Sequence, residues 1–270
     1  MDLFRTRDHV PDFDVYVGAY RERSAATRAR CRAELDVPYG SGEFERLDLF
    51  FPEGEVREAP VHLFIHGGYW RMFDKSDFSF VADTVVGAGG VAAILNYSLM
   101  PAVRMETVVR QVRAAAAWLQ ERAAAFGGDP QNLTISGHSA GGHLCAFLLD
   151  TDSPVRPRGA LMLSGIYELA PLQRSFLQPE IGITDEEVHR FSPLRLAYQP
   201  SGPAILMAGE RETAPFHEQG QAMAATLRRD GVKAAFHSIP GANHMSIVLD
   251  LGDSGTAPGQ ALASLMKQEA

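Results

Sequence analysis

The chain has 270 residues, 46% of them hydrophobic, which is enough to bury one large core. Its formal net charge of −8 argues against nucleic acid as a partner, and no apolar run approaches the roughly 20 residues that span a bilayer. The amino terminus is charged, and the two cysteines, Cys31 and Cys145, show no metal-ligand spacing. We therefore expect a cytoplasmic protein that uses neither a metal nor another cofactor.

Segments with the character of strands and helices alternate along the chain, which is typical of a mostly parallel sheet covered by helices. The segments that we expect to be strands are 44–51, 61–65, 91–97, 132–136, 159–164, 203–209 and 234–239. We expect helices over Tyr16–Leu35, from about Met105 to Phe126, in the segment after residue 141 and over Gln260–Lys267. Residues 1–36 and 167–200 fall outside the alternation. We expect both to be small cap segments over the functional site of a single domain, residues 1–270, because neither can fold alone.

A glycine-rich loop, His66-Gly67-Gly68-Tyr69-Trp70, follows the apolar segment 61–65. Acyl transfer passes through a tetrahedral oxyanion, and its catalysts hold hydrogen-bond donors where that oxygen develops. Glycine lets backbone N–H groups turn inward without obstruction by side chains. An ordinary glycine turn after a strand is the alternative interpretation. The order of this loop and the next motif along the chain favours a candidate oxyanion hole.

The pentapeptide Gly137-His138-Ser139-Ala140-Gly141 lies between the strand-like segment 132–136 and a buried helix-like segment. G-x-S-x-G in this setting is typical of a nucleophile elbow, a strained turn that holds the serine hydroxyl clear of the sheet. Side chains beside the serine would collide with the neighbouring strand and helix, which explains the small residues. Ser139 is therefore the candidate nucleophile, and the N–H of Ala140 is one candidate oxyanion donor.

A serine nucleophile needs a histidine base, which in this fold follows the acid in the chain. That order excludes the four histidines that come before Ser139, and His143 is too close in sequence to return to it. Of the four that remain, His244 is best placed, because it lies in a loop directly after the segment 234–239. Loops at the carboxyl ends of parallel strands build the sites of open α/β sheets.

The acid should follow the segment 203–209, and no aspartate occurs between Asp185 and Asp230. The acid of a triad is therefore a glutamate. Glu212 lies a few residues past the strand end, where its carboxylate can reach a histidine on the adjacent loop. Glu210 is the alternative, and otherwise reads as a surface charge.

The chain resembles the kynurenine formamidase (arylformamidase) branch of the α/β-hydrolases, which is related to the hormone-sensitive-lipase-like esterases. The resemblance covers about residues 39–249 and is carried by the glycine-rich loop, the segment 137–144 and Ser164-Gly165-Ile166-Tyr167-Glu168-Leu169. It implies an α/β-hydrolase fold and hydrolysis of a formamide, amide or ester by a metal-independent serine, acid and histidine triad. It also implies oxyanion donors at the N–H groups of Gly68, Tyr69 and Ala140. The family's acid is normally aspartate, whereas Glu212 occupies the matching position.

Three functions follow as hypotheses. The first is a formamidase or small amidase of the N-formylkynurenine type, and the second is an esterase acting on short acyl or aryl esters. The third is a catalytically inactive hydrolase fold used for binding, which a large separation between Glu212 and His244 would favour. The charged end of a kynurenine-type substrate needs polar partners, and the candidates are Arg71, Arg104 and Asn243. The alternative is that each of them is an ordinary loop or surface residue. We expect a small-molecule substrate, with no nucleic-acid or membrane partner, and the sequence indicates no oligomeric state.

Overall fold

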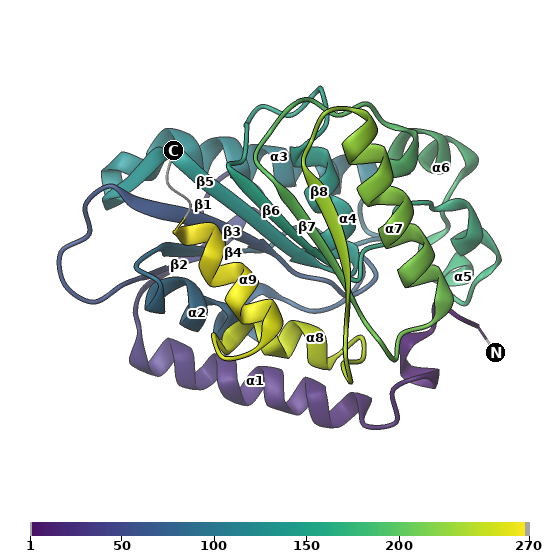
Figure 1. Ribbon diagram of the computed structural model, residues 1–270, viewed down its shortest axis with the longest axis horizontal. Coiled ribbons are helices and arrows are strands. Elements are labelled where there is room, and N and C mark those ends of the chain that lie inside the picture. The colour runs from purple at the N-terminus through teal and green to yellow at the C-terminus, as the bar shows by residue number, and fades with distance from the viewer. Residues whose placement is uncertain (1, 268–270) are drawn as a thin grey trace.

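Eight strands form one sheet in the computed structural model, which describes residues 2–267 (Figure 1). They are β1 (Arg32–Pro38), β2 (Arg46–Phe51), β3 (Ala59–Ile65), β4 (Val91–Leu95), β5 (Gly128–His138), β6 (Gly159–Leu163), β7 (Ala204–Gly209) and β8 (Ala234–Ile239). Their order across the sheet is β1-β2-β4-β3-β5-β6-β7-β8. β2 is antiparallel to both of its neighbours, and every other pair is parallel. The expected mostly parallel sheet is confirmed.

Helices cover both faces of this sheet. α1 (Phe13–Arg30), α2 (Ala82–Gly87), α8 (Ser246–Leu249) and α9 (Ala257–Met266) lie on one face, in the lower half of Figure 1. α3 (Met105–Arg122), α4 (Ala140–Cys145), α6 (Asp185–Phe191) and α7 (Ala214–Arg229) lie on the other, and α5 (Gln178–Ile181) is near its edge. Each layer has its own core: Tyr20 and Leu262 belong to the first, and Val112 and Leu227 to the second. Because both faces are covered, the central strands β4 and β6 are apolar and buried along their whole length.

Several sequence-based boundaries were wrong: β5 runs over Gly128–His138 rather than 132–136, β4 ends at Leu95 rather than at residue 97, and α9 begins at Ala257 rather than at Gln260. The helical spacing was expected to continue to Leu35, but α1 ends at Arg30 and residues 32–38 form the edge strand β1. β1 pairs with β2, for example Ala33 with Phe50, and most of its side chains are exposed. An exposed edge strand lacks the apolar alternation that marks a strand, so only its long-range pairing reveals it. β2 also starts at Arg46 rather than at Phe44.

The carboxyl ends of β3, β5, β6, β7 and β8 meet at the same edge of the sheet, because these strands are parallel and adjacent. The loops that follow them carry residues 66–70, Ser139, Ser164, residues 210–212 and residues 240–244. Of the expected domain, residues 1–270, Met1 and residues 268–270 lie outside the described residues. Within residues 2–267, no helix has the length and apolar character needed to cross a membrane.

Candidate active site

Ser139 lies on a strained turn between β5 and α4. Its φ of 55° and ψ of −117° belong to a backbone conformation that side-chain-bearing residues rarely adopt. Gly141 must lack a side chain, since a Cβ there would lie 1.9 Å from the carbonyl oxygen of Ile65. At Gly137 a Cβ would lie 2.3 Å from the carbonyl oxygen of Gly141. The elbow therefore presses closely against β3, which brings Ser139 beside the loop that follows β3.

The glycine-rich loop turns sharply after β3. Gly68, Tyr69 and Trp70 have φ angles of 111°, 55° and 59°. A Cβ on Gly68 would lie 2.3 Å from the carbonyl oxygen of Met72, so only glycine fits this position. A Cβ on Gly67 would approach the Cβ of Ser139 to 3.1 Å, which shows how near the loop runs to the serine.

The N–H groups of Gly68, Tyr69 and Ala140 find no hydrogen-bond acceptor within residues 2–267. Ala140 is the first residue of α4, where a backbone N–H has no partner inside the helix. Gly68 lines one cavity beside Ser139, and Tyr69 and Ala140 line another. Three unused donors thus lie in the segments that flank the serine.

His244 and Glu212 form a close pair. The Nδ1 of His244 donates to Oε2 of Glu212 over 2.6 Å, and the carboxylate side chain has no exposed surface. Glu210 does not approach His244: its Oε2 accepts the N–H of Gly241 at 2.8 Å on the protein surface. The structure therefore brings Glu212, rather than Glu210, to the histidine.

Ser164 also contacts this carboxylate, a role that the sequence did not reveal. Its hydroxyl donates to Oε1 of Glu212 at 2.5 Å, and the N–H of Gly209 donates to the same oxygen at 2.6 Å. Ser164 is buried and has a positive φ of 50°, so its backbone is held in a strained turn at the end of β6. The sequence placed Ser164 at the end of an expected strand and at the start of a segment that carries the family resemblance, but it gave no sign of this contact, which joins positions 48 residues apart.

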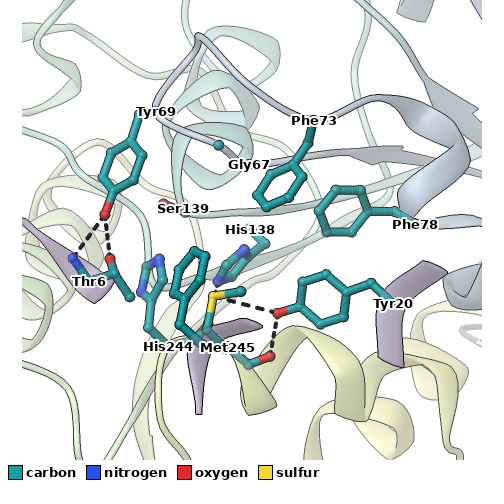
Figure 2. A pocket seen from close by; sticks show the side chains of 12 residues that line it. Thr6, Tyr20, Gly67, Tyr69, Phe73, Phe78, His138, Ser139, His244 and Met245 are labelled. Carbon is teal, nitrogen blue, oxygen red and sulfur yellow. Dashed lines mark hydrogen bonds between the residues drawn. The ribbon is translucent and has the colours of Figure 1, made fainter. Parts of the chain in front are cut away.

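Ser139 and His244 line the same cavity but are not joined by a hydrogen bond in the described part of the chain (Figure 2). Hydrogen bonds of this kind are often long without substrate and tighten when it binds. His138 fixes the backbone of the His244 loop, since its Nε2 donates to the carbonyl oxygen of His244 at 2.9 Å. Burial holds the pKa of His138 well below its ordinary value, so this ring stays neutral.

Two cavities meet at Ser139. The His244-side cavity has a volume of about 20 Å³ and is lined by His244 and by aromatic rings, namely Phe13, Tyr20, Phe73 and Phe78. The Ala140-side cavity has a volume of about 10 Å³ and is lined by apolar side chains, namely Phe4, Trp70, Ile166, Leu172, Leu177 and Phe216. Ser139 and His244 are each 5% exposed, so the site is closed in this conformation.

The candidates for binding a charged substrate end are placed differently. Arg104 is held by Glu187 and by the carbonyl oxygen of Ile181, at 2.9 Å from the latter, and so it serves the fold. The Oδ1 of Asn243 accepts the N–H groups of residues 245 and 246 inside its own loop. Arg71 lies in a groove next to the site: it pairs with Glu180 at 2.8 Å, and it shares the groove with Arg5, Arg7, Phe13 and Tyr69. We call this surface the arginine groove.

Known proteins that resemble this chain indicate its family and its fold. A model of the family BD-FAE matches residues 47–153. The chain is 30% identical to a kynurenine formamidase of Danio rerio, over 88% of this chain and 83% of that protein. It is 31% identical to a kynurenine formamidase of Salmo salar, over 93% and 88% of the two chains. A solved structure of a proposed thioesterase from Silicibacter superposes with a TM-score of 0.84 at 25% identity, covering 98% of each chain. The chain therefore belongs to the kynurenine formamidase family, has the α/β-hydrolase fold and is a hydrolase.

Proposed function

We propose that this protein is a serine hydrolase that cleaves a small aryl formamide or amide through an acyl-enzyme. Ser139 is the nucleophile, His244 the general base and Glu212 the acid that orients it. The observation that carries this proposal is the buried pair of Glu212 and His244, 2.6 Å apart, in a cavity shared with the strained Ser139. A binding protein without activity has no need of such a pair, and the third hypothesis loses its support.

The reaction follows the order of proton transfers that the pair allows. As Oγ of Ser139 attacks the carbonyl carbon, Nε2 of His244 takes its proton and Glu212 stabilises the imidazolium. The oxyanion is held by the N–H groups of Gly68, Tyr69 and Ala140. When the intermediate collapses, the leaving amine takes the proton from His244. Water then attacks the acyl-enzyme with His244 again as base, releasing the acid and Ser139.

The two cavities determine the orientation in which the substrate binds. Because His244 protonates the leaving group, the leaving group must lie in the His244-side cavity. That cavity is lined by the rings of Phe13, Tyr20, Phe73 and Phe78, which suit an aromatic amine. The acyl group then enters the Ala140-side cavity, whose volume of about 10 Å³ compares with about 20 Å³ on the His244 side and which suits a small formyl group. The substrate that best combines both ends is N-formylkynurenine, as the names of the relatives also suggest.

The arginine groove offers a place for the charged end of such a substrate. It shares Phe13 and Tyr69 with the walls around Ser139 and has a volume of about 200 Å³. Arg71 is positioned to receive a carboxylate there in exchange for Glu180, since arginine binds carboxylates in a bidentate manner.

A carboxylesterase on short acyl or aryl esters is the second candidate. The chain is 26% identical to the esterase LipQ of Mycobacterium tuberculosis, over 87% of this chain and 59% of that protein. Ester and amide hydrolysis use the same groups, and the two differ in the leaving group. The chemistry of the site alone therefore allows both.

Turnover of N-formylkynurenine and p-nitrophenyl acetate by the same preparation tests the proposal, with Ser139→Ala as the background control. We expect a higher kcat/KM for the formamide. A formamide rate equal to that of the control, beside rapid turnover of the ester, would assign the chain to the esterases instead.

A further inference from the structure

The segment that precedes α1, residues 2–10, crosses the closed site and is fastened to three separate parts of the chain. We call this segment the strap. At its start, Oδ2 of Asp2 accepts the N–H of Phe176 at 2.5 Å, which ties it to the 167–200 insertion. The hydroxyl of Thr213, beside the acid loop, donates to the carbonyl oxygen of Leu3 at 2.6 Å.

The third anchor is Tyr69, on the candidate oxyanion loop. Its hydroxyl accepts the N–H of Thr6 at 2.9 Å and donates to the carbonyl oxygen of Phe4 at 3.0 Å. Figure 2 shows Thr6 and Tyr69 side by side at the cavity that holds Ser139 and His244. The strap therefore bridges the acid loop, the oxyanion loop and the insertion, and its residues line both cavities beside Ser139.

Phe4 is the strap residue that lines the Ala140-side cavity, whereas Thr6 lines the His244-side cavity. The side chain of Phe4 is 9% exposed and its ring meets the ring of Phe216 edge-on at 6.5 Å. Together with Trp70 and Ile166 it lines the Ala140-side cavity next to Ser139. The volume of that cavity, about 10 Å³, is roughly enough for one water molecule.

We propose that Phe4, on the strap, determines acyl specificity by limiting the acyl group to one or two carbons. The proposal rests on the proposed function, since it takes Ser139 as the nucleophile and the Ala140-side cavity as the acyl site. Each methylene that such a cavity can or cannot hold changes kcat/KM by roughly 10- to 200-fold. Removing the ring of Phe4 clears the wall of this cavity without touching the serine, the histidine or the acid.

The test compares Phe4→Ala with the parent enzyme on p-nitrophenyl acetate, butyrate and hexanoate. The leaving group is constant in this series, so the ratio of kcat/KM for butyrate to that for acetate reports the acyl site alone. We expect the ratio to rise at least ~10-fold in Phe4→Ala. The matched control is Phe13→Ala, which removes an equal ring from the His244-side cavity and should leave the ratio unchanged.

An unchanged ratio in a folded Phe4→Ala enzyme, or an equal rise in Phe13→Ala, would overturn the proposal. If Phe4→Ala fails to fold, Phe4→Leu is measured in the same way. We expect a smaller rise of the butyrate-to-acetate ratio in this variant, and an unchanged ratio would again contradict the role of Phe4. Ser139→Ala separates this proposal from the one on which it rests. If that variant is inactive while the ratio in Phe4→Ala is unchanged, only the role of Phe4 is wrong. If that variant hydrolyses the esters as the parent does, the proposed function itself is wrong.

Discussion

Replacing Glu212 by glutamine should reduce kcat by about 10³-fold, within a range of 10²- to 10⁴-fold. The size follows from the charge that is lost. A carboxylate and an imidazolium with charge centres about 4 Å apart interact by roughly 4 kcal/mol at an effective dielectric constant near 20. At about 1.4 kcal/mol per tenfold in rate, that energy corresponds to nearly three powers of ten.

The structure also predicts which way the new amide will face. Both Ser164 and Gly209 donate to Oε1, so they hold the amide oxygen at that position. The amide nitrogen then faces Nδ1 of His244 and forces it to accept a hydrogen bond. The proton of the neutral imidazole moves to Nε2, which can no longer take a proton from Ser139. The loss should therefore appear mainly in kcat.

The assay is steady-state hydrolysis of p-nitrophenyl acetate and N-formylkynurenine by Glu212→Gln and by its matched control, Glu210→Gln. Glu210 lies two residues away and carries the same charge, and its exposed side chain accepts the backbone N–H of Gly241. Its variant should keep kcat within about threefold, as expected for a surface substitution worth at most ~0.5 kcal/mol. A Glu212→Gln enzyme with near-parent kcat, or a larger loss in Glu210→Gln, would refute the assignment of the acid.

Three further predictions concern positioning, metal and pH. Ser164→Ala should lower kcat about 10-fold and alter the pH profile of kcat/KM, because a buried hydrogen bond to a charged group contributes about 1.5–3 kcal/mol. The control is Ser192→Ala, which removes a similar hydrogen bond to Glu168, at 3.1 Å, and should change only the stability of the protein. No group of His, Cys, Asp or Glu within residues 2–267 is arranged to hold a metal, so EDTA should leave kcat unchanged, and activity restored by zinc after chelation would contradict this. Burial lowers the pKa of His62 to about 3 and of His143 to about 4, and it also lowers the pKa values of His66 and His138, so below pH 6.5 the unfolded chain binds up to four protons that the folded chain does not bind. The unfolding free energy from urea titrations should be nearly constant well above that pH and fall by up to about 5 kcal/mol per unit toward pH 4, and a flat profile would count against the buried neutral histidines.

The parts of the fold and site that could be predicted from the sequence depend on steric and burial requirements within short segments of the chain. The elbow around Ser139 and the loop at Gly67 and Gly68 need small residues at fixed positions, so their sequence carries a readable signal. The central strands are apolar because both faces are buried, and their positions were predicted to within a few residues. His244 could be chosen because the fixed chain order excluded the four histidines before Ser139 and because His244 lies in a loop directly after a strand.

The remaining features arise from contacts between distant positions. β1 is defined by its pairing with β2 rather than by an apolar pattern. Ser164 meets Glu212 across 48 residues, and the strap reaches Thr213 across 210. Local sequence propensity cannot predict such contacts, because each side chain is compatible with many surroundings until the folded sheet brings its partner close. The cap character of the first residues was predicted, but the place of Phe4 in the site was not.

The most direct test of the central claim is the kcat of Ser139→Ala on N-formylkynurenine, measured with the parent enzyme and with circular dichroism as a check of the fold. Because the triad acts as a unit, the account predicts a loss of at least ~10³-fold in a folded protein. Near-parent turnover by a folded variant of verified sequence would show that Ser139 is not the nucleophile, and the proposed mechanism would be wrong.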